Sequence, residues 1–545
     1  AAITTNKLVQ QEIAQIKNLL AQSRQARADA VKAEFNELNL LFRKSEEIEL
    51  GKKHLESALK SYRDLLAAVD QKFQEVFPAS PAQEQFTGYD AIKKEFLELS
   101  AKTEKKIKAI SVYLQGAATL YAQIQEMDKA DKIEEMTKLI YQMINTYPLS
   151  PLTRDLKIPV KVESNQAGAD VYLDNKKAGT TPVKIYLPLK GSAALKITKR
   201  GFSTYEKNIK AYEQSFVNVQ LEKTTLWTFR TGGVIESAPL VYKGLVIAAS
   251  RDGNVYGIDQ STGGLKWKYK TNTSQEIISS PKAISDLVVF GCYDTIVYAL
   301  KCSEMNAGKE WSFKTSAAVK SAPFASVNDE TIFIGSTDSY LYALSAQGQL
   351  LWKFAAGGKI SNSGFADNDT VYIPCDDGNV YAVDAKTGLQ KWKLSLTGKL
   401  TSLAKHENNI LVSSNNNNFY YISILDRQIK WTFKTKESVA AAPVVFGQTV
   451  YITSIDKTLY ALDIDKGEMK WVFPTKGALN GSVAVSLDGI VYFGSEDGFI
   501  YAVNGENGRE VWKYKTNGKI RSTPVLQNDT VYIGTDDSSI YALEK

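Results

Sequence analysis

Apolar residues follow a helical period in the first part of the chain and a strand period in the rest. From about Thr5 to Phe77 they fall three or four residues apart, with a break near Gly51. This spacing puts them on one face of a helix, so the segment predicts two long amphipathic helices. Pro78 and Pro81 end the second helix, because proline lacks an amide donor and restricts the residue before it.

Two further helices are predicted by the same spacing over residues 89–127 and 130–147. Each has a single apolar stripe, so the helices are expected to pair as antiparallel hairpins. The segment Ile144–Pro151 resembles the end of a tetratricopeptide-type helix pair, but no repeat of that family's period follows. Residues 1–156 are therefore interpreted either as a spacer or homo-oligomerising stalk, or as a peptide-binding helical array.

Apolar and polar positions then alternate over residues 158–222, which predicts a small β module at 157–223. From Thr225 onward, units of about 40 residues each repeat four β segments. The third segment of every unit has an apolar residue or tyrosine followed by tyrosine. The second residue of these pairs is Tyr256, Tyr298, Tyr342, Tyr381, Tyr421, Tyr460, Tyr501 or Tyr541.

All the tryptophans lie in the fourth segment of these units, 39 to 44 residues apart. Such a period, with short strands and tight turns, is typical of a β-propeller. Each indole is expected to pack across to the neighbouring blade. Strand 226–231 has the fourth-segment pattern without a unit before it, so it should complete the last blade and close an eight-bladed ring over 224–545. The tryptophans are Trp227, Trp267, Trp311, Trp352, Trp392, Trp431, Trp471 and Trp512.

Acidic turns join the second and third segments, and Asp252, Asp377 and Asp497 are each followed by glycine. Aspartate–glycine predicts a tight hairpin turn in which both central residues have positive φ. The carboxylates also raise the question of calcium. A structural role is expected instead, because the turns lack the alternating ligands of a calcium-binding loop.

The net charge of +6 belongs to one segment of the chain. Residues 157–223 contain 12 Lys and Arg against 6 Asp and Glu. Residues 1–156 and 224–545 are balanced, at 22 against 22 and 32 against 32. The excess is either a solvated lysine-rich surface or a contact for an anionic surface or polymer. No nucleic-acid partner is predicted.

Residue types that carry chemistry are sparse. Cys292, Cys302 and Cys375 lack the spacing of a zinc site, and the hairpin register disfavours a disulfide between the first two. His54 and His406 lie in different domains, without a nucleophile and an acid nearby in sequence. No apolar run reaches the length of about 18 residues typical of a membrane span, and no signal or anchor is present in the sequence. No catalytic, metal or cofactor-binding residue is therefore predicted, and no cofactor.

The innermost strands align on a Ser-Ala-Pro frame, which places one residue of each unit at the mouth of the central channel. Ring closure makes Arg521 a neighbour of Glu236, so these two are expected to pair. The set has no convergent acid, base or metal cluster, which favours a lining that admits or excludes water over a catalytic site. The aligned residues are Glu236, Ile278, Lys320, Ser361, Thr401, Ala440, Asn480 and Arg521.

Three glycine turns mark the segment 157–223, at Gly168-Ala169, Gly179–Pro182 and Gly201-Phe202. Their order resembles the PEGA domain, a small β-sandwich common in surface-exposed and extracytoplasmic bacterial proteins. Gln166-Ala167 replace the proline and glutamate of the motif that gives this family its name. The resemblance implies binding or spacing rather than catalysis.

Residues 382–392 read Ala-Val-Asp-Ala-Lys-Thr-Gly-Leu-Gln-Lys-Trp. They match every specified position of the motif Ala-x-Asp-x-x-Thr-Gly-x-x-x-Trp, and residues 257–267, 461–471 and 502–512 keep its frame. The units therefore resemble the PQQ-type repeat. Dehydrogenases of that family use vicinal cysteines and a calcium ion, whereas this chain has no adjacent cysteines. The resemblance points instead to the cofactor-free, BamB-like members, which serve as interaction scaffolds.

These observations predict a multidomain protein with a helical region at 1–156, a small β-sandwich at 157–223 and an eight-bladed all-β propeller at 224–545. The predicted function is that of a non-enzymatic scaffold in the bacterial envelope, outside the cytoplasm in the periplasm or at the cell surface, whose propeller docks other envelope proteins. A second possibility is the sensory ectodomain of a membrane-anchored signalling protein such as a Ser/Thr kinase. A quinoprotein-type enzyme ranks third.

Overall fold

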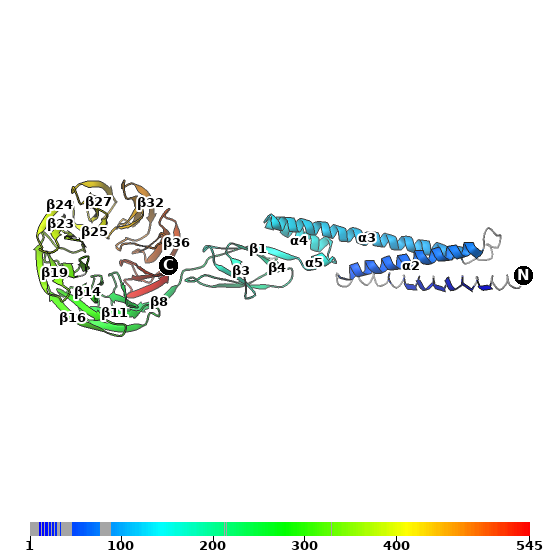
Figure 1. Cartoon of the computed structure of the whole chain (residues 1–545), viewed down its shortest axis with the longest axis horizontal. Helices are drawn as coiled ribbons and strands as arrows, with labels where there is room; N and C mark the ends of the chain where they lie inside the picture. The colour runs from blue at the N-terminus through cyan, green and yellow to red at the C-terminus, as the bar shows by residue number, and fades with distance from the viewer. Residues whose placement is uncertain are drawn as a thin grey trace. The chain divides into compact units, whose positions relative to one another are not determined.

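The computed structural model describes residues 46–76 and 89–545 except 212, 214 and 329, together with scattered residues between 10 and 33. The first predicted helix and its apolar stripe, like the stop at Pro78, therefore lie largely outside the described residues. The chain divides into two compact units (Figure 1). One comprises residues 1–199 and 204–221, and the other comprises residues 200–203 and 222–545.

Helices form the first part of the chain, as the apolar spacing predicts. They are α2 (Glu46–Val76), α3 (Tyr89–Lys129), α4 (Ile133–Thr146) and the short α5 (Pro151–Arg154). Ion pairs Asp70–Lys93 and Arg63–Glu104 join α2 to α3 in antiparallel register. The break expected near Gly51 is wrong, since Gly51 lies buried inside α2. One glycine costs a helix only about 1 kcal/mol and does not end it without a second signal.

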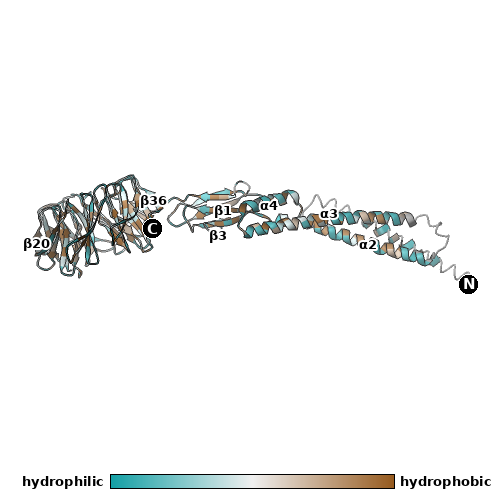
Figure 2. Cartoon of the chain, turned by 90° about the horizontal axis from the view of Figure 1, so that it is seen from above, coloured by the Kyte–Doolittle hydropathy of each residue, from teal (hydrophilic) through white to brown (hydrophobic). Residues whose placement is uncertain are grey.

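The end of α4 folds back onto α3. Helix α4 buries Met136, Ile140 and Met143 on one face, and brown and teal residues alternate along the helices in Figure 2. After the helix, the ring of Tyr147 lies edge-on to Tyr113 of α3, with 5.2 Å between the ring centroids. The backbone N–H of Leu149 donates to the Tyr113 hydroxyl at 3.0 Å. Aromatic packing and this hydrogen bond fix the exit from the helical pair.

Two sheets follow, with strand orders β4-β1-β7 and β3-β2-β5-β6. Alternate residues of β1 and β5 are buried, among them Val160, Val162, Leu195 and Ile197, which explains the period of two in the sequence. The strands are β1 (Lys157–Ser164), β2 (Asp170–Leu173), β3 (Lys176–Thr180), β4 (Val183–Pro188), β5 (Ala193–Thr198), β6 (Tyr205–Ile209) and β7 (Phe216–Val219).

A polar clasp joins this β module to the turn between α3 and α4. Lys184 of β4 forms ion pairs with Asp128 at 3.0 Å and Asp131 at 2.9 Å. The Tyr186 hydroxyl donates to Asp128 at 2.6 Å. Burial alone would lower the pKa of Lys184, but its hydrogen bonds to the two aspartates outweigh burial and raise it. The helices and the β module are therefore held together as one unit.

The second unit contains, within the described residues, eight four-stranded antiparallel sheets that follow one another around a ring (Figure 1). The first four sheets are β9 (Leu240–Tyr242), β10 (Leu245–Ala249), β11 (Asn254–Asp259), β12 (Leu265–Lys270); β13 (Lys282–Ile284), β14 (Leu287–Gly291), β15 (Ile296–Cys302), β16 (Ala307–Lys314); β17 (Phe324–Ala325), β18 (Thr331–Gly335), β19 (Tyr340–Ser345), β20 (Leu350–Ala355); and β21 (Phe365–Asp367), β22 (Thr370–Pro374), β23 (Asn379–Asp384), β24 (Gln390–Ser395). The next three are β25 (Leu400–His406), β26 (Asn409–Ser414), β27 (Asn418–Ser423), β28 (Ile429–Lys434); β29 (Val444–Phe446), β30 (Thr449–Thr453), β31 (Thr458–Asp463), β32 (Met469–Pro474); and β33 (Ala484–Val485), β34 (Ile490–Gly494), β35 (Phe499–Asn504), β36 (Glu510–Lys515).

The last sheet is built from both ends of this unit. It contains β37 (Val525–Gln527), β38 (Thr530–Gly534), β39 (Ser539–Glu544) and β8 (Thr225–Arg230). Strand β8 pairs antiparallel with β39, so that Trp227 lies opposite Ala542. The segment predicted to complete the ring therefore supplies the fourth strand of this sheet, which leaves no gap in the repeat.

The core of this unit lies between neighbouring sheets. The second and third strands of each sheet are almost fully buried, whereas the fourth is largely exposed. One buried cluster joins Phe333 and Leu341 of one sheet to Ile373 and Tyr381 of the next. Each sheet therefore completes the core of its neighbour, which is the reason a single unit cannot fold alone.

The turns between second and third strands differ from the prediction in one respect. Only one residue of each glycine-containing turn has positive φ, namely Gly253 at 77°, Gly378 at 84° and Gly498 at 79°. Before β23, the Gly378 N–H donates to the Cys375 carbonyl at 3.1 Å. The Asp377 carboxylate then accepts from the Asn379 N–H at 3.0 Å. The expected pair of positive φ angles is wrong, because the carboxylate closes the turn and a single glycine suffices.

Candidate functional site

The tryptophans link neighbouring sheets. The Trp352 indole N–H donates to the Ala385 carbonyl of the next sheet at 3.1 Å. A Cβ at Gly388 would lie 2.7 Å from the Trp352 ring, so the docking loop needs glycine there to approach the indole. The same indole bond recurs as Trp227–Gln260, Trp267–Ser303, Trp311–Ala346, Trp431–Ile464 and Trp471–Gly505.

Two tryptophans are bound differently. Within the described residues, the indole N–H groups of Trp392 and Trp512 have no such acceptor; a cation lies over each ring instead. The Arg427 guanidinium is 5.9 Å from the Trp392 ring centroid, and the Lys223 ammonium is 4.5 Å from that of Trp512. Lys223 also lies 4.3 Å from the Phe202 ring, so the turn at Gly201-Phe202 packs on the sheet that contains Trp512.

A second repeated contact joins the turn aspartates to the tyrosines of the third strands. The Tyr381 hydroxyl donates to Asp377 at 2.6 Å. Burial and this hydrogen bond raise the pKa of Tyr381 to about 12. The sequence shows the spacing, with an aspartate four residues before a tyrosine. The hydrogen bond between the two side chains becomes evident only from the geometry of the turn. The other pairs are Tyr256–Asp252, Tyr298–Asp294, Tyr342–Asp338, Tyr460–Asp456, Tyr501–Asp497 and Tyr541–Asp537.

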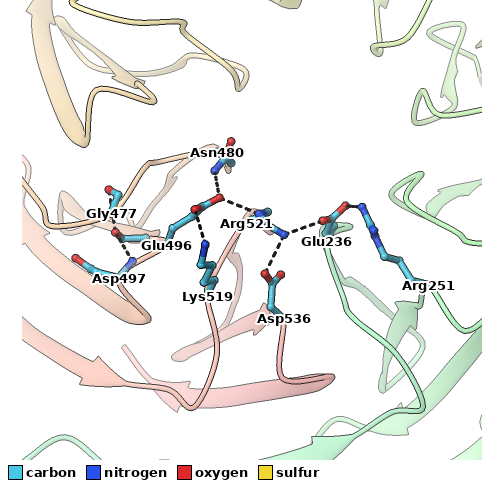
Figure 3. Close-up of polar contacts among 10 residues, drawn as sticks. Glu236, Arg251, Gly477, Asn480, Glu496, Asp497, Lys519, Arg521 and Asp536 are labelled. Atoms are coloured by element: carbon cyan, nitrogen blue, oxygen red, sulfur yellow. Dashed lines mark hydrogen bonds and ion pairs between the residues drawn. The ribbon is translucent and has the colours of Figure 1, made fainter.

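At the predicted channel mouth, Arg521 is the centre of a charged network (Figure 3). Its guanidinium lies 3.3 Å from Glu236, 2.8 Å from Glu496 and 2.9 Å from Asp536. Two of these three carboxylates, Glu496 and Asp536, lie outside the aligned set. The alignment included Glu236 but omitted the other two carboxylates, which come from the turns after the second strands.

Further polar groups extend the network on both sides of Arg521. Arg251 pairs with Glu236 at 2.7 Å, and Lys519 pairs with Glu496 at 3.3 Å. The Asn480 amide donates to Glu496 at 3.0 Å (Figure 3). Arg251, Glu496 and Asp536 each follow the Ser or Thr that comes after a second strand. An alignment on that residue identifies them as a second layer of the mouth.

The carboxylates around Arg521 differ in their electrostatics. Burial opposes ionisation of Glu496, but hydrogen bonds from Arg521 and Lys519 outweigh it and lower its pKa. Burial raises the pKa of Asp536, and the neighbouring Glu236 and Glu496 charges oppose the effect of Arg521. The Asp536 Oδ1 atom is buried without a hydrogen-bond partner among the described residues. The Arg521 guanidinium therefore stabilises the ionised form of Glu496 more than that of Asp536.

Of the other aligned residues, only Lys320 is charged. Thr401 donates to the Val439 carbonyl at 2.5 Å, and Ser361 donates to Asp376 at 3.4 Å. Lys320 lies 5.0 Å from the Tyr293 ring centroid. Ile278 and Ala440 complete the aligned set with apolar side chains. The dense charge is thus confined to the three sheets around the closing strand.

The remaining candidates lie away from this network. All the cysteines are free and buried, and burial raises the pKa of Cys292 and Cys375 to about 12. His54 is exposed on α2, and His406 shares a hydrogen bond of 2.9 Å with the Tyr421 hydroxyl. The described part of the chain contains no group of His, Cys, Asp and Glu able to hold a metal ion. No helix among the described residues is both long and apolar enough to span a bilayer.

Comparison with known proteins gives the family. The model of the outer membrane protein assembly factor BamB matches residues 219–304, 302–407, 377–479 and 473–545, and the PEGA domain model matches residues 158–225. BamB of Moranella endobia is 22% identical over 240 residues, which cover 42% of this chain and 61% of that protein. Tetrathionate hydrolase of Acidithiobacillus ferrooxidans is 25% identical over 193 residues, which cover 34% of each protein.

The chain thus spans less than two thirds of the length of these two relatives. The crystal structure of BamB from Moraxella catarrhalis has the same fold, with a TM-score of 0.51 and 17% identity over 59% of this chain and 99% of that one. Since the BamB model matches more than half of the chain, the protein belongs to the BamB family, and its PQQ-like repeats form a β-propeller preceded by a PEGA domain.

Proposed function

We propose that the chain is a non-enzymatic scaffold of the bacterial envelope, in which an eight-bladed propeller docks other envelope proteins. The match of the BamB model over residues 219–545 carries this proposal. Two of its relatives are named as outer membrane protein assembly factors. The PEGA match supports a location outside the cytoplasm, in the periplasm or at the cell surface.

The chemistry of the channel mouth supports a binding role over catalysis. Glu236, Glu496 and Asp536 are each engaged by Arg521, and Arg251 and Lys519 also pair with the two glutamates, so three cations balance three carboxylates. A general acid or base would have to present its proton to a substrate instead. The network is better suited to fix the sheets at the closing junction, where the first and last strands of the ring meet.

A quinone cofactor does not fit the residues that are present. Cys292 and Cys302 lie in one buried cluster of a blade interface and Cys375 lies in another, so none of them forms the adjacent pair used by the dehydrogenases. The side chains at the mouth that would have to receive a cofactor are paired with one another. This disagreement supports the non-enzymatic proposal.

The other modules are proposed as connecting parts. Residues 1–156 act as a spacing or homo-oligomerising arm, and residues 157–223 connect that arm to the propeller at 224–545. The clasp of Lys184 with Asp128 and Asp131 supports the first of these roles, because it holds the arm and the β module as one body.

The test is affinity capture from a bacterial envelope extract. The bait is either the full chain or a chain lacking residues 224–545, and circular dichroism checks that the shortened bait keeps its helices. The full chain is expected to capture proteins that the shortened chain loses. Identical partner lists would count against the propeller as the docking module. Partners retained only with residues 1–223 would move the docking role to the arm.

A further inference from the structure

A cavity of about 780 Å³ opens where the helical arm meets the β module. It lies within one compact unit, beside the end of α4, the short helix α5 and the adjoining ends of β1 and β4. Its apolar lining consists of Ile144, Pro148, Leu156, Pro188 and Leu189. The volume falls in the range typical of sites for small organic ligands, roughly 300–1,000 Å³.

The rim of this cavity is cationic. Arg154, Lys157 and Lys190 line it, and Asp155 is the acidic residue among them. Within the described residues neither Lys157 nor Lys190 forms an ion pair, and both are exposed. Other lysines of the same module are neutralised locally, as in the pair Lys177–Asp170 at 2.7 Å. Part of the positive excess of residues 157–223 therefore lies at the cavity rim, where it favours an anion.

Below the charged rim, the lining offers few hydrogen bonds to a peptide. Pro148 and Pro188 have no amide hydrogen, and the Thr153 hydroxyl already donates to the Tyr147 carbonyl at 2.7 Å. A peptide buried here would leave amide groups without partners, at a cost of about 1–3 kcal/mol each. An acyl chain has no such groups and gains from burial of every methylene, by about 0.8 kcal/mol.

We propose that the cavity binds a single-chain lipid with a phosphate head. The acyl chain lies on the apolar lining, and the phosphate contacts Lys157 and Lys190 at the rim. This site is separate from the propeller and does not depend on the scaffold function. It gives the basic segment of the chain a ligand of defined chemistry, a lipid rather than a polymer.

Titration of the full chain with dodecyl phosphate, held below its micelle concentration, tests the proposal by calorimetry. Saturable binding with one ligand per chain is expected. Inorganic phosphate lacks the chain and dodecyl maltoside lacks the charge, so each is expected to bind at least about tenfold more weakly. The double variant Lys157→Glu with Lys190→Glu should lose about tenfold or more in affinity, since both charged contacts are reversed.

The matched control is Lys176→Glu with Lys207→Glu, which makes the same charge change at exposed positions of the module outside the cavity. This control should bind like the native chain. A second variant, Leu189→Trp, fills the cavity without changing its charge and should also weaken binding. Equal affinity of the native chain and the rim variant, with both folded by circular dichroism, would overturn the proposal. Tighter binding of an apolar peptide than of dodecyl phosphate would overturn it as well.

Discussion

The neighbouring sheets β21–β24 and β25–β28 have the same strand order but different docking contacts. The first presents Gly388 to the preceding tryptophan and closes its turn with Asp377. The second has Arg427 at φ 62° in the glycine position and Asn416 in the aspartate position. Both keep the same register shift between third and fourth strands. The four-strand pattern and the shared core therefore specify the sheet, and the docking contacts are individually replaceable.

The largest loss of stability is expected where the loop at Gly388 packs against the Trp352 ring. Gly388→Ala puts a methyl group 2.7 Å from the Trp352 ring at φ 72°. Left-handed strain and overpacking together are expected to cost about 2–4 kcal/mol. Calorimetric unfolding of the full chain measures this loss. The control is Gly447→Ala, at φ 56° with no atom within 4 Å of the added Cβ, which has the strain alone. Equal losses in the two variants would show that the indole contact does not constrain the loop.

A smaller effect is expected at the turn. In Asp377→Asn the charged acceptor of Tyr381 and of the Asn379 N–H is lost, with an expected cost of about 1.5–3 kcal/mol at pH 7. The reverse change, Asn416→Asp, should add stability to the sheet β25–β28. Denaturant unfolding at pH 7 measures both changes.

The pH dependence of Asp377→Asn separates charge from shape. Burial raises the pKa of Asp377, but hydrogen bonds from Tyr381, Cys375 and Asn379 outweigh it and lower the pKa below its usual value. The carboxylate therefore contributes stability above its unfolded pKa of about 3.9, and the contribution is lost as the pH falls through the lower folded value. The difference between native chain and variant should shrink below about pH 4. A difference that stays constant down to about pH 2.5 would contradict this account.

The indoles provide a third comparison. Trp352→Phe removes a ring and the hydrogen bond to the Ala385 carbonyl, whereas Trp392→Phe removes a ring with no such bond among the described residues. The first variant should lose about 0.5–1.5 kcal/mol more than the second. Thermal unfolding of the two variants side by side measures the difference. A larger loss at Trp392 would show that its contact with Arg427 contributes more than the hydrogen bond.

Repetition explains how much of this fold the sequence predicts. The apolar spacing predicts the helical region, and the recurring Trp and Tyr positions predict the propeller-like region and its closing strand, because each position is sampled eight times along the chain. The same alignment brings Glu236 and Arg521 together at the mouth. It misses Glu496 and Asp536, because these residues lie in the turns after the second strands, outside the Ser-Ala-Pro frame. Their convergence on Arg521 depends on the packing of the last two sheets, which the local sequence does not show.

Non-repeating segments are harder to predict for the same reason. A single glycine, Gly51, predicts a break in a helix that continues through it, since one local propensity is outweighed by the packing of α2 on α3. The cavity beside α5 is not visible in the sequence at all. Its lining comes from the end of α4, from β1 and from β4, whose meeting depends on tertiary structure.

The smallest effect is expected at Arg427 itself. Arg427→Gly relieves left-handed strain of about 1 kcal/mol. It also loses the contact with the Trp392 ring, worth about 0.5–1 kcal/mol, and gains flexibility in the unfolded chain, so the stability should change by less than about 1 kcal/mol. Arg427→Ala keeps the strain and loses the cation, so calorimetry should find it less stable than both the native chain and the glycine variant. An increase in stability of more than about 1.5 kcal/mol in Arg427→Gly would show that the contact of the cation with Trp392 does not offset the backbone strain at Arg427. Replacement of glycine by Arg427 would then have lowered the stability of sheet β25–β28 relative to its neighbour.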